Sequence, residues 1–119
     1  MAPRHVAAVV IGRNEGSRLV ACLRSVRPQT DRLVYVDSGS TDGSPEAARG
    51  LGAEVIALDM SRPFTAARAR NVGWRHALAR WPDTDALQFI DGDCEVDAGW
   101  LPEAVAFLGE RPEVVAVCG

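Results

Sequence analysis

The chain has 119 residues, of which 47% are hydrophobic and 24% charged, and a formal net charge of −3. This length suits a single domain, the composition argues against disorder, and no stretch approaches the ~20 apolar residues of a membrane span. The mildly acidic balance, without a basic block to meet phosphates, predicts a protein that binds no nucleic acid.

The three cysteines, Cys22, Cys94 and Cys118, lie far apart, and no Cys-x-x-Cys pair occurs. Their number and spacing argue against a disulfide framework and against a zinc ribbon. Free thiols are typical of a reducing compartment, so we expect a cytoplasmic location, with the inner face of a membrane as an alternative.

The first half of the chain alternates strand and helix patterns. Residues 5–11 form a short apolar run rich in Val, which predicts a strand buried on both faces. Apolar residues then recur at helical spacing from Ser17 until Pro28. Residues 33–36 predict a second strand, and a turn at 38–43 follows it. After this turn, Ser44 is the expected N-cap of a short helix, with Pro45 in its first turn and Gly50 or Gly52 at its end.

The second half continues this alternation. We expect strands at residues 54–58, 86–90 and 114–117, and helices at residues 64–79 and from Pro102 to Leu108. Strands and helices that alternate at this spacing imply right-handed crossovers. The predicted fold class is therefore α/β: a mostly parallel sheet with flanking helices, in one domain spanning residues 1–119.

Polar residues follow three of the predicted strands at the point where each strand ends. They are Gly12-Arg13-Asn14-Glu15, Asp37-Ser38-Gly39-Ser40 and Asp91-Gly92-Asp93. In a parallel sheet these ends lie at one edge, where ligands of α/β proteins bind. The pattern thus predicts a site at the carboxyl ends of the strands.

Asp91-Gly92-Asp93 carries the strongest chemical signal. Two carboxylates one residue apart repel each other unless a cation is near, and hard oxygen ligands favour Mg²⁺ or Mn²⁺. An isolated Asp-x-Asp is more often a solvated or helix-capping loop, but its position directly after a strand favours a metal site. Asp37 has two balanced interpretations, a ligand for a ribose or base and an Asx-turn that ends the strand.

Other polar and aromatic residues lie outside these three loops. An Arg in the first turns of the 64–79 helix can reach an anion at the same edge, whereas Arg75 and Arg80 fit a solvated face better. His5 and His76 have no visible partner, and Cys94 is expected to pack. The three tryptophans are expected at or near the core, with Trp100 as the one that can line a pocket.

Together these segments resemble the family 2 glycosyltransferases. The resemblance rests on four motifs in the family's order, which are Val9-Val10-Ile11-Gly12-Arg13-Asn14-Glu15, Val36-Asp37-Ser38-Gly39-Ser40-Thr41-Asp42-Gly43, Ala69-Arg70-Asn71-Val72-Gly73 and Phe89-Ile90-Asp91-Gly92-Asp93. It implies the GT-A fold, a UDP- or GDP-sugar donor, a divalent metal (Mg²⁺ or Mn²⁺) and inverting transfer to an acceptor hydroxyl.

The resemblance also implies roles for individual residues. Asp37 is expected to hold the base, Asp91 to lie near the ribose and to share with Asp93 a metal that bridges the diphosphate. The residues expected to bind the nucleotide sugar are Ile11, Arg13, Asn14, Glu15, Asp37, Gly39, Ser40, Arg70, Asp91 and Gly92. The chain departs from the family at Gly12-Arg13, where many members have Pro-Thr-Tyr. The family's catalytic base lies C-terminal to Asp-x-Asp, and the acidic residues after Asp93 match no later motif, so we expect residues 1–119 to be the donor-binding part of a longer enzyme.

Two alternatives remain open at this stage. One is a nucleotide- or metal-binding module without transferase activity, completed by homodimerisation. The other is a phosphatase of the haloacid-dehalogenase type, in which Asp91 would be the nucleophile. That motif usually follows the first strand and continues into Thr, whereas here it follows the fourth and continues into Cys94-Glu95. A sugar nucleotidyltransferase would have a Gly-rich, basic loop after Ile11, and this loop is missing.

Overall fold

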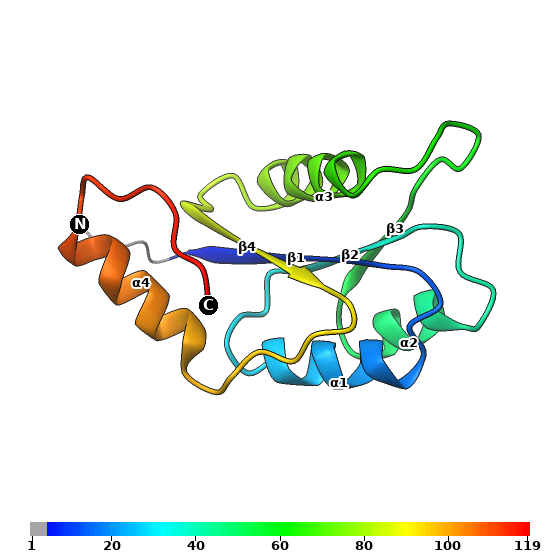
Figure 1. The fold of residues 1–119 in the computed structure, drawn as a ribbon, viewed down its shortest axis with the longest axis horizontal. Coiled ribbons are helices and arrows are strands. Elements are labelled where there is room, and N and C mark those ends of the chain that lie inside the picture. Colours follow the sequence, from blue (N-terminus) through cyan, green and yellow to red (C-terminus); the bar gives the residue numbers. More distant parts are fainter. Residues whose placement is uncertain (1–4) are drawn as a thin grey trace.

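The computed structural model describes residues 5–119, which form alternating strands and helices around one sheet (Figure 1). In chain order the elements are β1 (Val6–Gly12), α1 (Ser17–Val26), β2 (Leu33–Asp37), α2 (Ser44–Gly50), β3 (Glu54–Ala57), α3 (Ala66–Arg80), β4 (Ala86–Asp91) and α4 (Trp100–Glu110). The α/β fold class is confirmed.

The four strands are parallel and lie in the order β3-β2-β1-β4. Helices α1 and α2 cover one face of the sheet, and α3 covers the other (Figure 1). The chain builds outward from β1 to β3 and then returns through α3 to place β4 on the other side of β1. The strand order therefore reverses at β1, and in open α/β sheets ligands bind at such a reversal.

Each face of the sheet has its own apolar core. On one face Leu19 and Leu23 of α1 pack with Val10 and Tyr35, and all four are fully buried. On the other face α3 approaches β1 and β2 closely through Gly73. A Cβ at that position would overlap the side chain of Val9 and lie 3.1 Å from Val36 Cγ2. The absence of a side chain at Gly73 thus sets how near α3 lies to the sheet.

The short helix α2 differs from the prediction in its cap. Gly43, with a φ of 84°, is the N-cap, and Ser44 is the first helical residue. The side chain of Asp42 supplies the capping contacts, because its Oδ1 accepts hydrogen bonds from Ser44 N at 3.0 Å and Ser44 Oγ at 2.6 Å. These hydrogen bonds lower the pKa of Asp42, and the bond from the Ser44 hydroxyl is the largest cause.

The predicted strand at residues 114–117 is wrong. This segment has no strand partner; Val114 N instead bonds to Arg111 O at 2.9 Å, and the side chain of Val115 is 93% exposed. A Val-rich segment favours an extended chain but does not specify a neighbour for it. The two edges of the described sheet are therefore β3 and β4.

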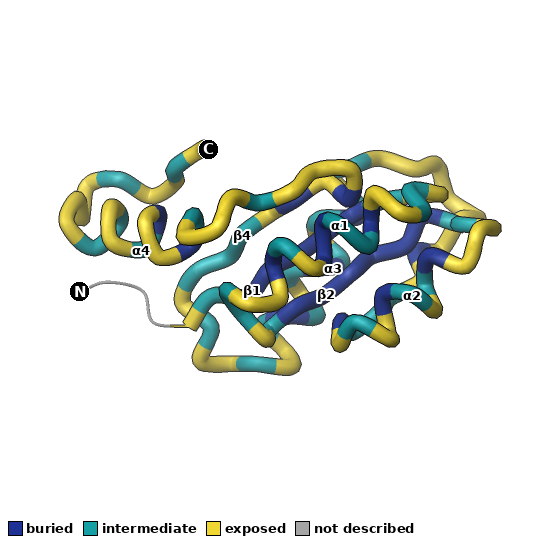
Figure 2. Tube along the Cα trace, turned by 90° about the horizontal axis from the view of Figure 1, so that it is seen from below, coloured by how far each residue is buried: buried dark blue, intermediate teal, exposed yellow. Residues whose placement is uncertain are grey.

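Helix α4 and residues 112–119 extend beyond the sheet and are mostly exposed (Figure 2). The buried residues of α4 are Leu101 and Ala104. Within residues 5–119, none of the helices has the length and apolar character needed to cross a bilayer.

Candidate functional site

The ends of β2, β1 and β4 meet at one edge of the sheet, as the sequence predicted. Gly12 pairs with Asp37, and Ile11 pairs with Asp91. The turn after β1 therefore lies between the loop that follows β2 and the turn that follows β4. We call this set of three loops the rim; it comprises residues 12–16, 37–43 and 91–94.

Two loops of the rim are tied together by Asn14 and Ser40. Asn14 N donates to Ser40 Oγ at 2.8 Å, and Asn14 Oδ1 accepts from Thr41 N at 2.7 Å. Asn14 has a φ of 51°, a conformation that Asn tolerates better than most residues. Both side chains are thus partly used in holding the rim together.

Asp37 is buried beneath these loops, with 4% of its surface exposed. Its Oδ1 accepts a hydrogen bond from the Tyr35 hydroxyl at 2.7 Å, and its Oδ2 accepts one from Ser40 N at 2.8 Å. The pKa of Tyr35 is raised, mainly by burial and secondly by its hydrogen bond to Asp37. The structure therefore contains the Asx-turn that was one interpretation of Asp37. The carboxylate holds its loop in place, and its oxygens keep further lone pairs.

The turn after β4 places two carboxylates at the surface around a buried glycine. Asp91 and Asp93 are exposed, whereas Gly92 is buried and its N–H donates to Ile11 O at 2.8 Å. A Cβ at Gly92 would lie 3.0 Å from that same oxygen, so a side chain there would push the turn away from β1. Glycine at this position therefore keeps the two acids against the turn after β1.

Arg70 brings a positive charge from α3 to these acids. Its Nη2 lies 3.2 Å from Asp91 Oδ1, and the two side chains are 40% and 58% exposed. Arg70 is thus the α3 arginine that lies beside the acids at this edge. A half-exposed guanidinium beside a carboxylate can donate hydrogen bonds to an anionic group of a ligand.

Glu15 fills the space between the turns after β1 and β4. Its Cγ would lie 3.3 Å from a Cβ at Gly12 and 3.6 Å from one at Gly92. Its carboxylate forms an ion pair with Arg18, with Nε 3.0 Å from Oε2. Arg13, by contrast, is exposed at the tip of the turn. The turn after β1 thus carries a partly buried acid, Glu15, and an exposed arginine, Arg13.

The donor atoms at Asp91 and Asp93 fit a hard divalent cation that brings its own ligands. Within the described residues, no three His, Cys, Asp or Glu side chains form a cluster able to hold a metal ion by themselves. Mg²⁺ commonly uses only one or two protein carboxylates, together with water and substrate phosphates. Two exposed carboxylates suit such shared coordination, and the pairing of Asp91 with Arg70 leaves Asp93 the more available of the two.

A hollow of about 380 Å³ lies beside the acids, on the side of α4. Trp100 lines it, as the sequence allowed, and its Nε1 donates to Gln88 Oε1 at 2.8 Å. Gln88 was missed because an amide inside a strand pattern carries no functional signal. Cys94, predicted to pack, is exposed in this hollow; its bond to Asp93 raises its pKa, which disfavours the thiolate.

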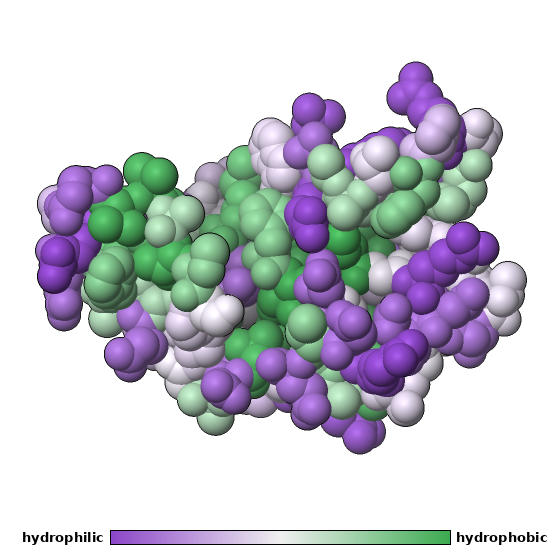
Figure 3. Space-filling model, in the orientation of Figure 1, coloured by the Kyte–Doolittle hydropathy of each residue, from purple (hydrophilic) through white to green (hydrophobic). Residues whose placement is uncertain are grey.

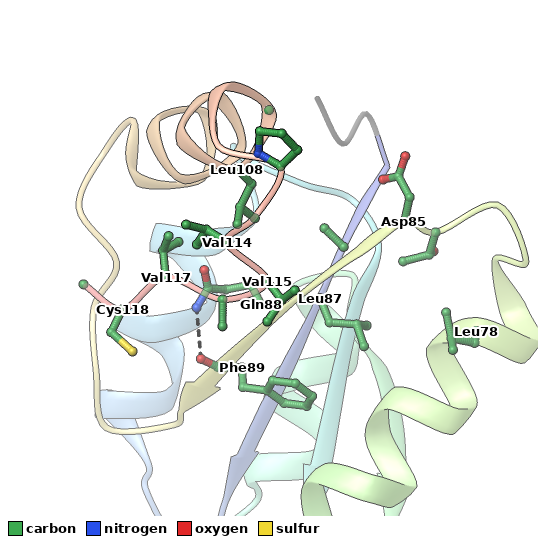
Figure 4. Close-up of a pocket in the computed structure, with 16 residues that line it drawn as sticks. Leu78, Asp85, Leu87, Gln88, Phe89, Leu108, Val114, Val115, Val117 and Cys118 are labelled. Atoms are coloured by element: carbon green, nitrogen blue, oxygen red, sulfur yellow. Dashed lines mark hydrogen bonds between the residues drawn. The ribbon is translucent and has the colours of Figure 1, made fainter. Parts of the chain in front are cut away.

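A larger groove of about 1080 Å³ runs along the outer side of β4 (Figure 4). It is lined by β4, the end of α4 and residues 112–119, with Leu87, Phe89, Leu108, Val114 and Val117 among its side chains. Hydrophobic side chains gather on this part of the molecule (Figure 3). The groove lies outside the rim, and the acids Asp91 and Asp93 do not line it.

The histidines have partners that the sequence did not reveal. His76 Nε2 lies 2.9 Å from Glu54 Oε1, and Arg80 Nε lies 2.9 Å from Glu54 Oε2. His5 lies beside Arg32, with Nδ1 3.3 Å from Nη2. Both clusters lie away from the rim, as expected for residues without a role in the site.

A parallel sheet with carboxylates and an arginine at its order reversal has the architecture of α/β proteins that bind ligands at this point. The sequence model for glycosyl transferase family 2 matches residues 7–119. The chain belongs to this family, and the resemblance seen in the sequence is confirmed. The family match leaves no ground for the phosphatase alternative.

Two curated relatives match most of the chain, and one of them is named a glycosyltransferase. The chain is 33% identical to a TPR repeat-containing protein of Synechococcus elongatus, over 93% of the chain and 28% of that protein. It is 30% identical to the glycosyltransferase AglE of Haloferax volcanii, over 87% of the chain and 35% of AglE.

Among solved structures, glucosyl-3-phosphoglycerate synthase of Mycobacterium tuberculosis, in complex with Mn²⁺, UDP and glucosyl-3-phosphoglycerate, matches with a TM-score of 0.66 and 28% identity. This match covers 88% of the chain and 39% of the synthase. S. aureus TarS matches in fold: its residues 1–349 give a TM-score of 0.68 and 24% identity over 92% of this chain and 33% of that fragment. The fold is thus that of the GT-A glycosyltransferases. The match covers 28–39% of the two relatives, the synthase and the TarS fragment.

Proposed function

We propose that residues 1–119 bind the nucleotide-diphosphate sugar donor of an inverting, metal-dependent glycosyltransferase. The observation that carries this proposal is the pairing of Arg70 with Asp91 beside Asp93, at the point where the strand order reverses. Carboxylates for a cation and a guanidinium for a phosphate then lie side by side. The Mn²⁺ and UDP in the mycobacterial synthase support this combination of ligands.

The positions of residues in the rim indicate which part of the donor each would contact. The nucleoside end lies toward Asp37, Gly39 and Ser40, and the diphosphate lies toward Arg70 and the acids of β4. The turn after β1, with Ile11, Arg13, Asn14 and Glu15, forms the floor between the two ends. In this arrangement the rigid bonds Asn14–Ser40 and Asp37–Ser40 keep the loops in place before the donor binds.

Asp93, together with Asp91, would hold Mg²⁺ or Mn²⁺ at the diphosphate. The cation supplies positive charge that stabilises a diphosphate leaving group. Arg70 adds a second fixed positive charge at the same place, and it needs no reorganisation because its guanidinium already lies at the rim. The chain's own contribution is thus to orient the diphosphate and to balance its growing negative charge.

Transfer itself forms a bond between the acceptor oxygen and the anomeric carbon. The bond from that carbon to the diphosphate oxygen breaks, the nucleoside diphosphate leaves with the electron pair, and a carboxylate base takes the acceptor proton. Attack from the side opposite the leaving group inverts the anomeric centre. The base is not assigned to a residue of this chain.

We further propose that the 119 residues are the donor-binding part of a longer protein located in the cytoplasm. The length of the relatives supports the first point, since the chain spans 28–39% of them. Three free cysteines, two of them exposed, support a reducing compartment. The alternative function is a donor-binding module without transfer activity, and the unassigned base favours it for the chain alone.

Calorimetric titration of the purified chain with UDP and with GDP, each with and without Mn²⁺, tests the proposal. We expect binding that depends on Mn²⁺, that is lost in Asp93→Ala and that is retained in Asp31→Ala. Asp31 is an exposed carboxylate just before β2, at the opposite edge of the sheet, so it controls for net charge. A folded chain that binds neither nucleotide would contradict the proposal.

A further inference from the structure

The segment between β3 and α3 (residues 58–65) passes the rim at Gly39. Leu58 N donates to Asp37 O at 2.8 Å, which keeps the segment alongside the end of β2. Two residues later the side chain of Met60 lies on Gly39, because a Cβ there would be 3.2 Å from Met60 Cγ. The thioether therefore adjoins the loop of Asp37 and Ser40.

Arg68 braces this segment from the first turn of α3. Its guanidinium donates to three backbone oxygens of the segment, those of Asp59, Arg62 (3.5 Å) and Pro63 (3.3 Å). Its backbone N–H bonds to Thr65 Oγ1 at 3.0 Å, which caps the helix. A single side chain thus ties one end of the segment to the other.

The segment is also closed on itself near Met60. Asp59 Oδ1 accepts hydrogen bonds from Ser61 N at 3.0 Å and from Ser61 Oγ at 2.6 Å. These bonds lower the pKa of Asp59, so the carboxylate stays ionised and keeps accepting them. In Figure 1 the segment projects past the end of α3, yet its backbone is held at several points.

Met60 is an exposed apolar side chain at a polar rim. It is 41% exposed and adjoins Gly39, in the rim loop that also contains Asp37 and Ser40. A planar, aromatic ligand with polar edges needs polar groups at its edge and an apolar side chain on its face. Thioethers make favourable contacts of this kind with aromatic rings.

We propose that Met60 covers one face of the nucleoside base of the donor, and that Arg68 is a positioning residue that holds Met60 there. This inference rests on the proposed donor site, and it adds a determinant of nucleoside binding from outside the motifs that carry the family resemblance. A sulfur–aromatic contact of ordinary strength changes affinity by about threefold to tenfold.

The test compares UDP with inorganic pyrophosphate, which lacks the base, by calorimetry in the presence of Mn²⁺. We expect Met60→Ala to weaken UDP binding about threefold to tenfold and to leave pyrophosphate binding unchanged. Met60→Leu should lose less UDP affinity than Met60→Ala. Phe107→Ala is the control, because Phe107 is a similarly exposed side chain (43%) on α4. Unchanged UDP affinity in a folded Met60→Ala variant would overturn the inference and leave the donor site intact.

A double-mutant cycle tests the role of Arg68. Arg68→Ala should weaken UDP binding but not pyrophosphate binding, and it should have little further effect when Met60 is already Ala. Equal losses for both ligands, or fully additive losses, would show that Arg68 does not act through Met60. Wild-type protein that binds neither UDP, GDP nor pyrophosphate would instead overturn the donor site itself, and with it this inference; if it binds GDP rather than UDP, the same variants are compared with GDP.

Discussion

The Tyr35 hydroxyl donates a 2.7 Å hydrogen bond to Asp37 Oδ1, and both side chains are buried. Tyr35 lies in the core beneath α1, whereas Asp37 is the last residue of β2. The bond therefore connects the hydrophobic core with the rim, and it fixes the carboxylate that the loop around Ser40 depends on.

Replacing Tyr35 with Phe removes the donor while keeping the ring. We expect a loss of about 1–3 kcal/mol in the free energy of unfolding, because one oxygen of a buried carboxylate loses its partner. Urea denaturation followed by circular dichroism measures this loss. An unchanged midpoint would mean that the bond contributes nothing to stability.

Gly73 offers a second test, of packing rather than of hydrogen bonding. Gly73→Ala should destabilise the protein by about 1–3 kcal/mol, because the new methyl group overlaps Val9 and crowds Val36. Gly50→Ala is the matched control, since a Cβ at this helical residue meets nothing within 4 Å. The same denaturation experiment should show the control equal to wild type or slightly more stable, and equal losses in both variants would refute the packing argument.

Arg70 should matter for ligand binding much more than for stability. The Arg70–Asp91 pair is partly exposed, so Arg70→Ala should change the free energy of unfolding by less than about 1 kcal/mol. Loss of a charge-assisted bond to the diphosphate should weaken UDP binding about tenfold or more. Arg75→Ala, on the same helix, is the control and should bind UDP as wild type does. Equal affinities of the two variants would remove Arg70 from the donor site.

The ion pair of Arg32 and Asp83, at the edge opposite the rim, makes a pH-dependent contribution to the stability of the folded protein. Arg32 donates to both oxygens of Asp83, at 2.7 and 3.2 Å, and this holds the pKa of the carboxyl below its usual value. A lowered pKa stabilises the folded state above the unfolded pKa of about 3.9, and this stabilisation disappears as the pH falls through the folded value.

Arg32→Gln should therefore be less stable than wild type near ~pH 6, and the difference should shrink below ~pH 4. Denaturation curves at several pH values measure it. Arg49→Gln, which removes an exposed charge on α2, serves as the control. A difference that is independent of pH would assign the effect to the Arg32–Thr84 bond (3.1 Å) instead of the ion pair.

Much of the fold and of the rim follows from sequence, because apolar runs and turn residues act locally. The strand at residues 86–90 and its terminal acids are visible as a short apolar run followed by Asp91-Gly92-Asp93. Parallel pairing then brings these acids to Gly12 and Asp37, which only requires that all strands point the same way. Local patterns thus predict which residues gather at the rim.

Contacts between distant side chains are a different matter. Nothing in the sequence pairs His76 with Glu54, or places Met60 on Gly39, because these contacts depend on how the segments between them turn. The valines of residues 114–117 show the converse, since their pattern indicates a strand although no neighbour is present to pair with it. Periodicity identifies an element but not its partner.

The position of β4 has a consequence for how the protein folds during synthesis. All strand pairs are parallel, and Val6 of β1 pairs with Ala86 of β4, at opposite ends of the sheet-forming region. Chains fold from the N-terminus as they emerge, and long-range parallel pairing is slow. The first three strands with α1 and α2 can assemble early, whereas Asp91 and Asp93 reach the rim only when β4 docks. We therefore expect metal-dependent nucleotide binding to appear at the last step of folding, which makes it a direct reporter of completion.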